Sequence, residues 1–173
     1  MTKKPFSTEQ TRANIARVTA ILGGSPGWLE RLSRDLTVEQ LHQSLGAGER
    51  SFVENLAHLV NSEARSSEAI YLALLVDEPF LAPVHSERQW GKLVRYDVLP
   101  FTELLAYFKT RREVLLRVLN GLDDGQWSRT VREASKKRQE SVYWKARALA
   151  LHELEHLTDL EAKLTFATRS QLV

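Results

Sequence analysis

Apolar residues recur at intervals of three and four along most of this sequence, the spacing that places them on one side of an α-helix. Ile15, Val18, Ile21 and Leu22 form one such stripe. No segment shows several residues of clean apolar and polar alternation between turn signals, which a half-buried strand would require. The pattern predicts an all-α protein.

Helix start and stop signals divide the chain into long helical segments. The first is expected over about residues 8–22, with Ser7 and Gln10 as a capping box at its start. Gly23 and Gly24 are expected to end it, because glycine is the commonest residue just after a helix.

Capping signals also open the later segments. Two short helical pieces are expected between residues 25 and 48, the second beginning at Thr37. The other long helices are expected over about residues 51–75, 101–120 and 141–166. Residues 77–91, which carry two prolines, and the mostly polar residues 122–139 are expected to be irregular connections.

The length of 173 residues provides for one domain with a hydrophobic core and is short for two. Residues 1–173 are therefore expected to form a single domain. Four long helices on a chain of this length predict a four-helix bundle, with short extra helices between the first and second long helices.

The composition disfavours several classes of protein. No apolar run approaches the roughly 20 residues of a membrane span, and the N-terminus lacks a signal-peptide pattern, so a cytoplasmic protein is expected. Because there is no cysteine, any metal must be held by His, Asp or Glu. The 24 basic and 22 acidic residues nearly balance, and the short basic clusters lack interleaved aromatic residues, so nucleic-acid binding is not expected.

Two histidines in the sequence HELEH are the first candidate site. His152 and His156 are four positions apart, so on a helix they project from the same face. The motif is open to three interpretations: a zinc-protease signature, a different metal site, or an amphipathic helix with two histidines on one face. Neither Asp159 nor Ala162, three and six positions after His156, continues the protease pattern, so that interpretation is disfavoured.

A third histidine lies upstream, in the predicted second long helix. His58 shares a polar strip with Asn61, whereas Leu59 lies on the apolar side of the same helix. A polar strip either faces solvent or lines a polar cavity, so spacing alone makes His58 a solvated residue or a third metal ligand. The remaining histidines, His42 and His85, are expected at the surface.

The order and spacing of several blocks resemble the DinB-like (YfiT-type) family of metal-binding four-helix bundles. The blocks are ENLAHLVNSE, DEP, LLAYFKTRREVLLRVLNGLDDGQW and ESVYWKARALALHELEHLTDLEAKL, and together they span most of the chain. The resemblance implies that His58, His152 and His156 hold one divalent metal ion. Zn and Ni are the first candidates, with Fe and Mn as alternatives.

The resemblance also implies a type of activity, because similar proteins include thiol-dependent S-transferases and isomerases. The expected function is a metal-dependent enzyme that activates a low-molecular-weight thiol (S-transferase type) or water (hydrolase type) against a small electrophilic substrate, in detoxification or stress response. A homodimer is expected. A non-catalytic metal-binding or metal-sensing protein and a helical interaction module without metal stay open as alternatives.

Acidic residues near the histidines are candidates for supporting roles. Glu54, Glu155 and Asp159 lie within a helical turn of a candidate ligand and could accept a hydrogen bond from its second ring nitrogen. If water is the nucleophile, Glu153 or Glu155 could act as general base, and spacing does not choose between them.

Overall fold

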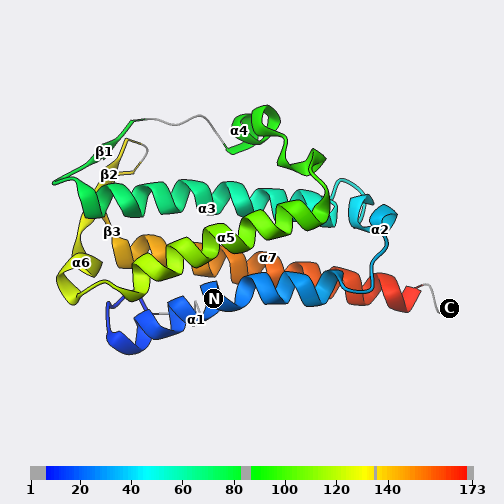
Figure 1. The fold of residues 1–173 in the computed structure, drawn as a ribbon, viewed down its shortest axis with the longest axis horizontal. Helices are drawn as coiled ribbons and strands as arrows, with labels where there is room; N and C mark the ends of the chain where they lie inside the picture. Colours follow the sequence, from blue (N-terminus) through cyan, green and yellow to red (C-terminus); the bar gives the residue numbers. More distant parts are fainter. Residues whose placement is uncertain (1–6, 83–86, 135, 171–173) are drawn as a thin grey trace.

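The computed structural model describes residues 7–82, 87–134 and 136–170, and it is mostly helical (Figure 1). In chain order the elements are α1 (Arg12–Ser33), α2 (Val38–His42), α3 (Phe52–Leu75), β1 (Phe80–Leu81), α4 (Glu87–Val94), the 3-10 helix η1 (Tyr96–Val98), α5 (Phe101–Asn120), α6 (Asp124–Ser128), β2 (Thr130–Glu133), β3 (Glu140–Ser141) and α7 (Val142–Ser170).

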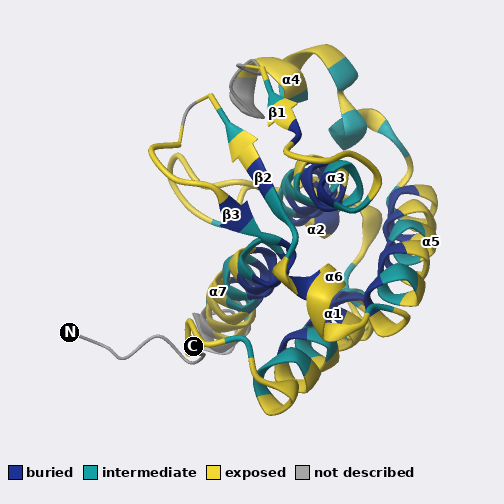
Figure 2. Cartoon of the chain, turned by 90° about the vertical axis from the view of Figure 1, so that its left-hand side faces the viewer, coloured by how far each residue is buried: buried dark blue, intermediate teal, exposed yellow. Residues whose placement is uncertain are grey.

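The long helices α1, α3, α5 and α7 form a bundle. α1 packs against α5 and α7, and α3 packs against the same two helices. α1 and α3 are therefore diagonal to each other, and the view along the bundle shows buried stretches of the helices on the sides that face the shared interior (Figure 2). The predicted all-α four-helix bundle is confirmed.

The start of α1 differs from the prediction. Its N-cap is Thr11, whose Oγ1 accepts a hydrogen bond from the Asn14 amide at 3.2 Å. The expected capping box at Ser7 and Gln10 is therefore wrong. The Gln10 side chain instead donates a hydrogen bond to the carbonyl oxygen of Asp124, which joins this segment to α6.

The predicted end of this helix is also wrong, because α1 continues through Gly23, Gly24 and Pro26. Proline has no amide hydrogen, so the carbonyl of Leu22, four residues earlier, loses its partner within the helix. Arg112 of α5 donates from Nη1 to that carbonyl oxygen at 2.5 Å. The first of the two expected short pieces thus belongs to α1, and α2 is the single short helix between α1 and α3 in the described residues.

Other start signals are confirmed. Capping boxes open α2 and α3 at the predicted residues, and Ser51 and Glu54 form the second of them. The amide of Ser51 donates to Glu54 Oε2 at 2.7 Å, and the Glu54 amide donates to Ser51 Oγ at 3.2 Å. α5 begins directly after Pro100, as the sequence predicts.

The two segments expected to be irregular contain short elements. Residues 77–91 include β1 and the start of α4, and residues 122–139 include α6 and β2. β1 pairs in parallel with β2, with Phe80 opposite Arg132, and β2 pairs antiparallel with β3. Strands of two to four residues are too short to show periodic alternation, which explains why the sequence did not predict them.

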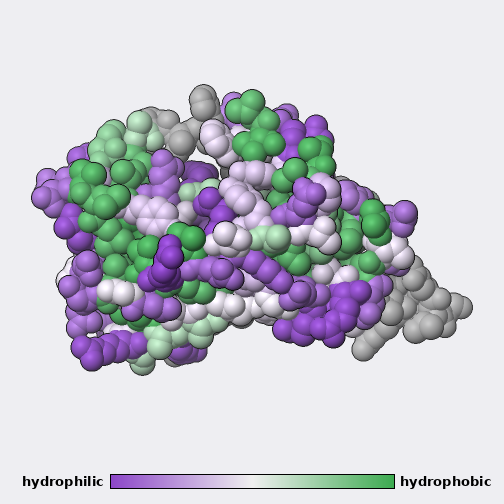
Figure 3. All heavy atoms as spheres, viewed as in Figure 1, coloured by the Kyte–Doolittle hydropathy of each residue, from purple (hydrophilic) through white to green (hydrophobic). Residues whose placement is uncertain are grey.

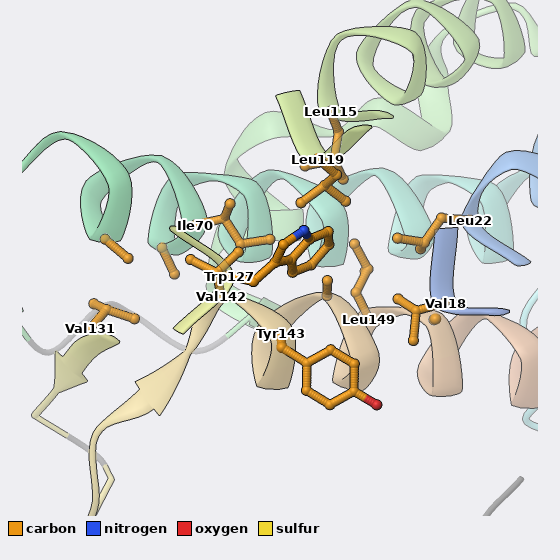
Figure 4. Packing of buried hydrophobic residues seen from close by; sticks show 14 residues of the cluster. Val18, Leu22, Ile70, Leu115, Leu119, Trp127, Val131, Val142, Tyr143 and Leu149 are labelled. Carbon is orange, nitrogen blue, oxygen red and sulfur yellow. The ribbon is translucent and has the colours of Figure 1, made fainter. Parts of the chain in front are cut away.

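The apolar interior consists of two clusters along the bundle. In one, Trp127 lies among Ile70, Leu119 and Val142 (Figure 4). The other contains Phe52 and Phe108, from the first halves of α3 and α5. On α3, α5 and α7 the two clusters are separated by a buried charged side chain, so a polar layer crosses the bundle between them.

In the described ranges, no helix is both long enough and apolar enough to cross a membrane. Exposed large apolar side chains gather over α4 and η1, where Leu93 and Val98 are exposed, and over the end of α3 and β1, where Leu75 and Phe80 are exposed. Figure 3 shows apolar surface at both places. The first of these regions forms the outer wall of a cavity described below.

Candidate metal centre

His58 of α3 meets His152 and His156 of α7 where the two helices pack together. The Nε2 atom of His58 lies 3.0 Å from Nε2 of His152 and 3.0 Å from Nε2 of His156. One ring nitrogen from each histidine lies within 4.8 Å of the other two, and all three side chains are partly buried. The structure therefore brings together the three histidines that the sequence pointed to.

Local helical geometry and the packing of α3 against α7 produce this convergence. His152 and His156 are one turn apart, with ring centroids separated by 4.5 Å. On α3, the neighbours Leu59 and Val60 are buried in the apolar interior, so His58 lies at the border of the core. The capping box at Ser51 sets where α3 begins and hence where His58 is placed along it.

The surroundings of His156 favour the form that binds metal. Burial lowers the pKa of His156 to about 4, and the nearby His152, His58 and Arg50 act in the same direction. At neutral pH His156 is therefore uncharged, with a ring nitrogen lone pair available as a ligand.

The three imidazoles fit a single divalent ion. Bonds from zinc to imidazole nitrogen are about 2.0–2.1 Å long. Nitrogens separated by 3.0 Å can therefore share one ion. A proton can bridge only two ring nitrogens, whereas an ion satisfies all three. Within the part of the chain that the structure describes, this is the one group of three metal-ligating side chains with such proximity.

Glu153, next to His152 in the sequence, has a different environment. Its side chain is fully buried, and both of its carboxylate oxygens accept hydrogen bonds from Arg112 of α5. The same guanidinium donates to Glu63 of α3 at 2.9 Å. The carboxylate of Glu153 is thus engaged in the interior by an arginine, which disfavours it as a general base relative to the exposed Glu155.

Arg112 connects all four long helices. From α5 it donates to the Leu22 carbonyl of α1, to Glu63 of α3 and to Glu153 of α7. Burial raises the pKa of Glu63, and the charge of Arg112 opposes that shift. This network holds α3 and α7 in register beside the centre, so it helps to set the position of His58 relative to His152.

The sequence analysis did not identify Arg112, because it lies in the short basic cluster KTRR, and such clusters are usually solvent-exposed. A signal was present in the helical spacing. Phe108 lies four residues before Arg112, and Leu115 and Leu119 lie three and seven residues after it, all buried. Arg112 is therefore on the apolar face of α5, where a charged residue requires buried partners.

The other acidic candidates are distributed around the centre. The Glu54 carboxylate accepts a hydrogen bond from the Ser51 amide as part of the helix cap. Asp159 is exposed and forms an ion pair with Lys163 at 2.7 Å. Glu155 is exposed, and its charge partly opposes the lowering of the His156 pKa. Of the two candidate general bases, Glu153 and Glu155, only Glu155 is thus exposed.

The two histidines expected at the surface do not join the centre. His42 is exposed at the end of α2, as predicted. His85 lies outside the described residues.

Two cavities open beside the centre. The larger, about 670 Å³, is lined by His58 and neighbouring residues of α3 and by the α4 and η1 segment. The smaller, about 280 Å³, is lined by His152 and by residues of α3, α7 and the sheet. The larger cavity is within the size range of small-molecule sites, so His58 is accessible to a ligand from that side.

Comparison with known proteins agrees with this architecture. The structure is similar to that of YfiT from Bacillus subtilis, described as a probable metal-dependent hydrolase with an unusual four-helix bundle topology. The TM-score is 0.81 at 19% sequence identity, over 98% of this chain and 93% of that chain, a likeness that shows the shared fold. No curated protein gives a significant match. The sequence matches the model of the DinB superfamily over residues 25–160, most of its length, and the chain belongs to that superfamily.

Proposed function

We propose that this protein is a metal-dependent enzyme that binds one divalent ion through His58, His152 and His156 and acts on a small electrophilic substrate. The observation that carries the proposal is the convergence of three imidazole nitrogens beside a cavity. Zn or Ni is proposed as the ion, with Fe or Mn as alternatives, because neutral imidazole suits several transition metals.

Three protein ligands leave at least one coordination position open, as in catalytic zinc sites and unlike closed structural sites. A divalent ion in such a site acts as a Lewis acid and lowers the pKa of a coordinated water or thiol towards neutrality. The fold shared with a probable metal-dependent hydrolase supports water as the nucleophile. Since the chain has no cysteine, a thiol nucleophile would have to be a cosubstrate.

The residues of this chain have distinct roles in the proposal. The three histidines hold the ion in their neutral form, which the low pKa of His156 favours. The Arg112 network keeps α3 and α7 in register. The carboxylate of Glu155, which is exposed and near enough to His156 for its charge to affect that pKa, is proposed to accept a proton from the nucleophile, whereas Glu153 is buried.

Metal analysis tests the ligand set. The protein is purified, loaded with Zn or Ni, and its metal content is measured by mass spectrometry beside His58→Ala and His156→Ala. One ion per chain is expected for the wild type, with loss in both variants. His42→Ala, which removes an exposed histidine outside the centre, is the matched control and should keep its metal. Unchanged metal content in either His58→Ala or His156→Ala would contradict the proposed ligand set.

Turnover is tested separately on the metal-loaded protein. Activated esters and amides test for hydrolysis, and glutathione or cysteine with an aryl halide tests for thiol transfer. Activity that disappears on chelation and returns with metal supports an enzyme. A full metal complement without activity against either panel would favour the non-catalytic alternative.

A further inference from the structure

The larger cavity beside the histidine centre has an unequal balance of charges. It lies between α3 and the α4 and η1 segment, which runs alongside α3 in Figure 1. Three basic and two acidic side chains line it: Arg50, Lys92, Arg95, Glu54 and Asp97. The acids are already engaged: Glu54 accepts from the Ser51 amide, and Asp97 forms a two-point ion pair with Arg95 at 3.0 Å.

Two of the basic side chains are left without an acidic partner. Within the described residues, neither Arg50 nor Lys92 has a carboxylate within 4.0 Å of its charged nitrogens. Arg50 also lies near enough to His156 for its charge to disfavour protonation of that ring. Both cations therefore line the same cavity as His58, with their charge available to a ligand.

One residue that lines the cavity carries a buried acceptor. Asn61, one turn after His58 on α3, is 4% exposed, and its Oδ1 has no hydrogen-bond partner within the described part of the chain. A Cβ atom built on Gly91 of α4 would lie 3.5 Å from Asn61 Nδ2, so the α4 backbone packs against this side chain. A buried acceptor without a partner is costly, so a turn of the Asn61 amide towards the cavity would let a ligand donor relieve that cost on binding.

We infer that this cavity binds the substrate by a carboxylate or phosphate group, held by Arg50 and Lys92, and by an N–H or O–H group donated to Asn61. The inference rests on the proposed function of the adjacent histidine centre. An ion held by three neutral imidazoles keeps its full double charge, which further favours an anionic ligand there. The substrate class is thus a small anion carrying a hydrogen-bond donor.

Binding of small probes tests this without any need for turnover. Calorimetry on the metal-loaded protein compares phenylacetate, phenyl phosphate and hippurate with the neutral phenylacetamide and hippuramide. Phenylacetate and hippurate are each expected to bind at least about tenfold more tightly than the corresponding amide, and phenyl phosphate at least about tenfold more tightly than phenylacetamide, because only the anions form charge-assisted hydrogen bonds. Equal binding of charged and neutral members would overturn the inference, as would no binding by any anion.

Substitutions of Arg50 and Lys92 test whether these two side chains bind the anion. Arg50→Gln and Lys92→Gln should each weaken hippurate binding about fivefold or more and leave hippuramide unchanged. The matched control is Arg117→Gln, which removes the same charge from an exposed position near the C-terminal end of α5, outside the cavity. If all three variants bind hippurate as the wild type does, the anion is bound by the metal alone and the inference is wrong.

The role of Asn61 is tested with Asn61→Leu, which has a similar volume, and with Asn61→Ala. Hippurate binding should weaken, whereas N-methylhippurate, which lacks the N–H group, should bind the wild type and both variants equally. Thermal stability should not fall in Asn61→Leu, because the buried unsatisfied acceptor is removed. A loss of stability with unchanged probe binding would give Asn61 a structural role instead.

Metal content is measured for every variant, so this inference and the proposed function can fail separately. Loss of anion selectivity with one ion still bound contradicts the inference alone. Absence of metal in the wild type contradicts the proposed function, and the charge preference of the cavity can then be measured on the metal-free protein.

Discussion

At the scale of single residues, two adjacent side chains of HELEH, those of His152 and Glu153, point to different parts of the structure. His152 turns to the helix interface with α3, whereas Glu153 turns into the interior and bonds to Arg112. A rotation of about 100° per residue on an α-helix is enough to separate them. The motif therefore combines a candidate metal ligand with a buried carboxylate that bonds to Arg112.

Arg112→Met is expected to destabilise the protein by about 3–5 kcal/mol at neutral pH, because it leaves the buried Glu153 without its cation and Glu63 with only its longer ion pair to Arg111, at 3.7 Å. Urea unfolding at pH 7 measures the change. The deficit should shrink at lower pH, as the carboxylates become protonated. Arg117→Met, at an exposed position on the same helix, should change stability by less than about 0.5 kcal/mol. A similar small effect for both variants would contradict a network that is important for stability.

The pKa of His156 predicts how the metal-free protein responds to pH. Its value is lowered in the folded state from 6.5 to about 4, mainly by burial, so between these values the unfolded chain binds more protons. The contribution of His156 to stability is thus complete above pH 6.5 and is lost as pH falls towards 4. Glu63, whose pKa is raised by burial, acts with the opposite sign.

Thermal melts in the presence of chelator between pH 7.5 and 4.5 test this. The melting temperature of the wild type should fall more steeply with acidification than that of His156→Gln, in which the Glu63 contribution is unchanged. If the melting temperatures of the two proteins fall in parallel as the pH is lowered, the pKa of His156 is not lowered in the folded state as described.

At the scale of elements, capping boxes predicted the starts of helices more reliably than glycine predicted a helix end. The boxes at Thr37 and Ser51 open helices where the sequence predicted them, because both partners lie within four residues. Gly23 and Gly24 did not end α1, because glycine ends a helix only when the chain beyond it takes another direction. Packing of α1 against α5 and α7 overrides that weak preference.

Gly24→Ala should therefore stabilise the protein by about 0.5–1 kcal/mol, since alanine is the better helix former. A Cβ atom at Gly24 would meet nothing within 4 Å, so no clash opposes the gain. Gly48→Ala is the control with the opposite expectation, because Gly48 has a φ of +76° that disfavours a side chain. Denaturant unfolding of both variants measures the changes, and destabilisation by Gly24→Ala would indicate that α1 is interrupted at this residue.

At the scale of the whole molecule, the histidine centre joins two long helices that are far apart in sequence. His58 and His152 are separated by 94 positions, and the unfolded chain cannot hold them together. An ion that binds only the folded form raises its stability by mass action. The metal is thus expected to act as a cross-link between α3 and α7 as well as a reactive centre.

Free metal at 100 times its dissociation constant should stabilise the fold by about 2.7 kcal/mol. For a chain of this length the gain corresponds to a rise in melting temperature of roughly 5–10 °C. Calorimetric melts with and without chelator measure the difference, and His58→Ala should abolish it. Indifference of the wild type to chelator and added Zn or Ni would favour the interaction module without metal.

Local information in the sequence was enough for much of this protein. Helical periodicity predicted the presence of the four long helices, although not the bounds of α1, and a capping box predicted the start of α3. The spacing of His152 and His156 predicted their shared face, because it depends on residues within one turn. Resemblance to a family supplied His58 as a partner, which spacing alone left open. The two-residue and four-residue strands were too short to leave a period.

Only the tertiary structure decided the features that depend on contacts between distant segments. Arg112 satisfies the Leu22 carbonyl that Pro26 leaves free, 90 positions away, and so α1 continues where its own sequence predicted an end. The same guanidinium takes Glu153 out of the candidate site. The cavity with Arg50, Lys92 and Asn61 likewise exists only once α4 lies beside α3. Hydrogen bonds and charges act over a few ångströms in space whatever their separation along the chain, and a single sequence does not record that proximity.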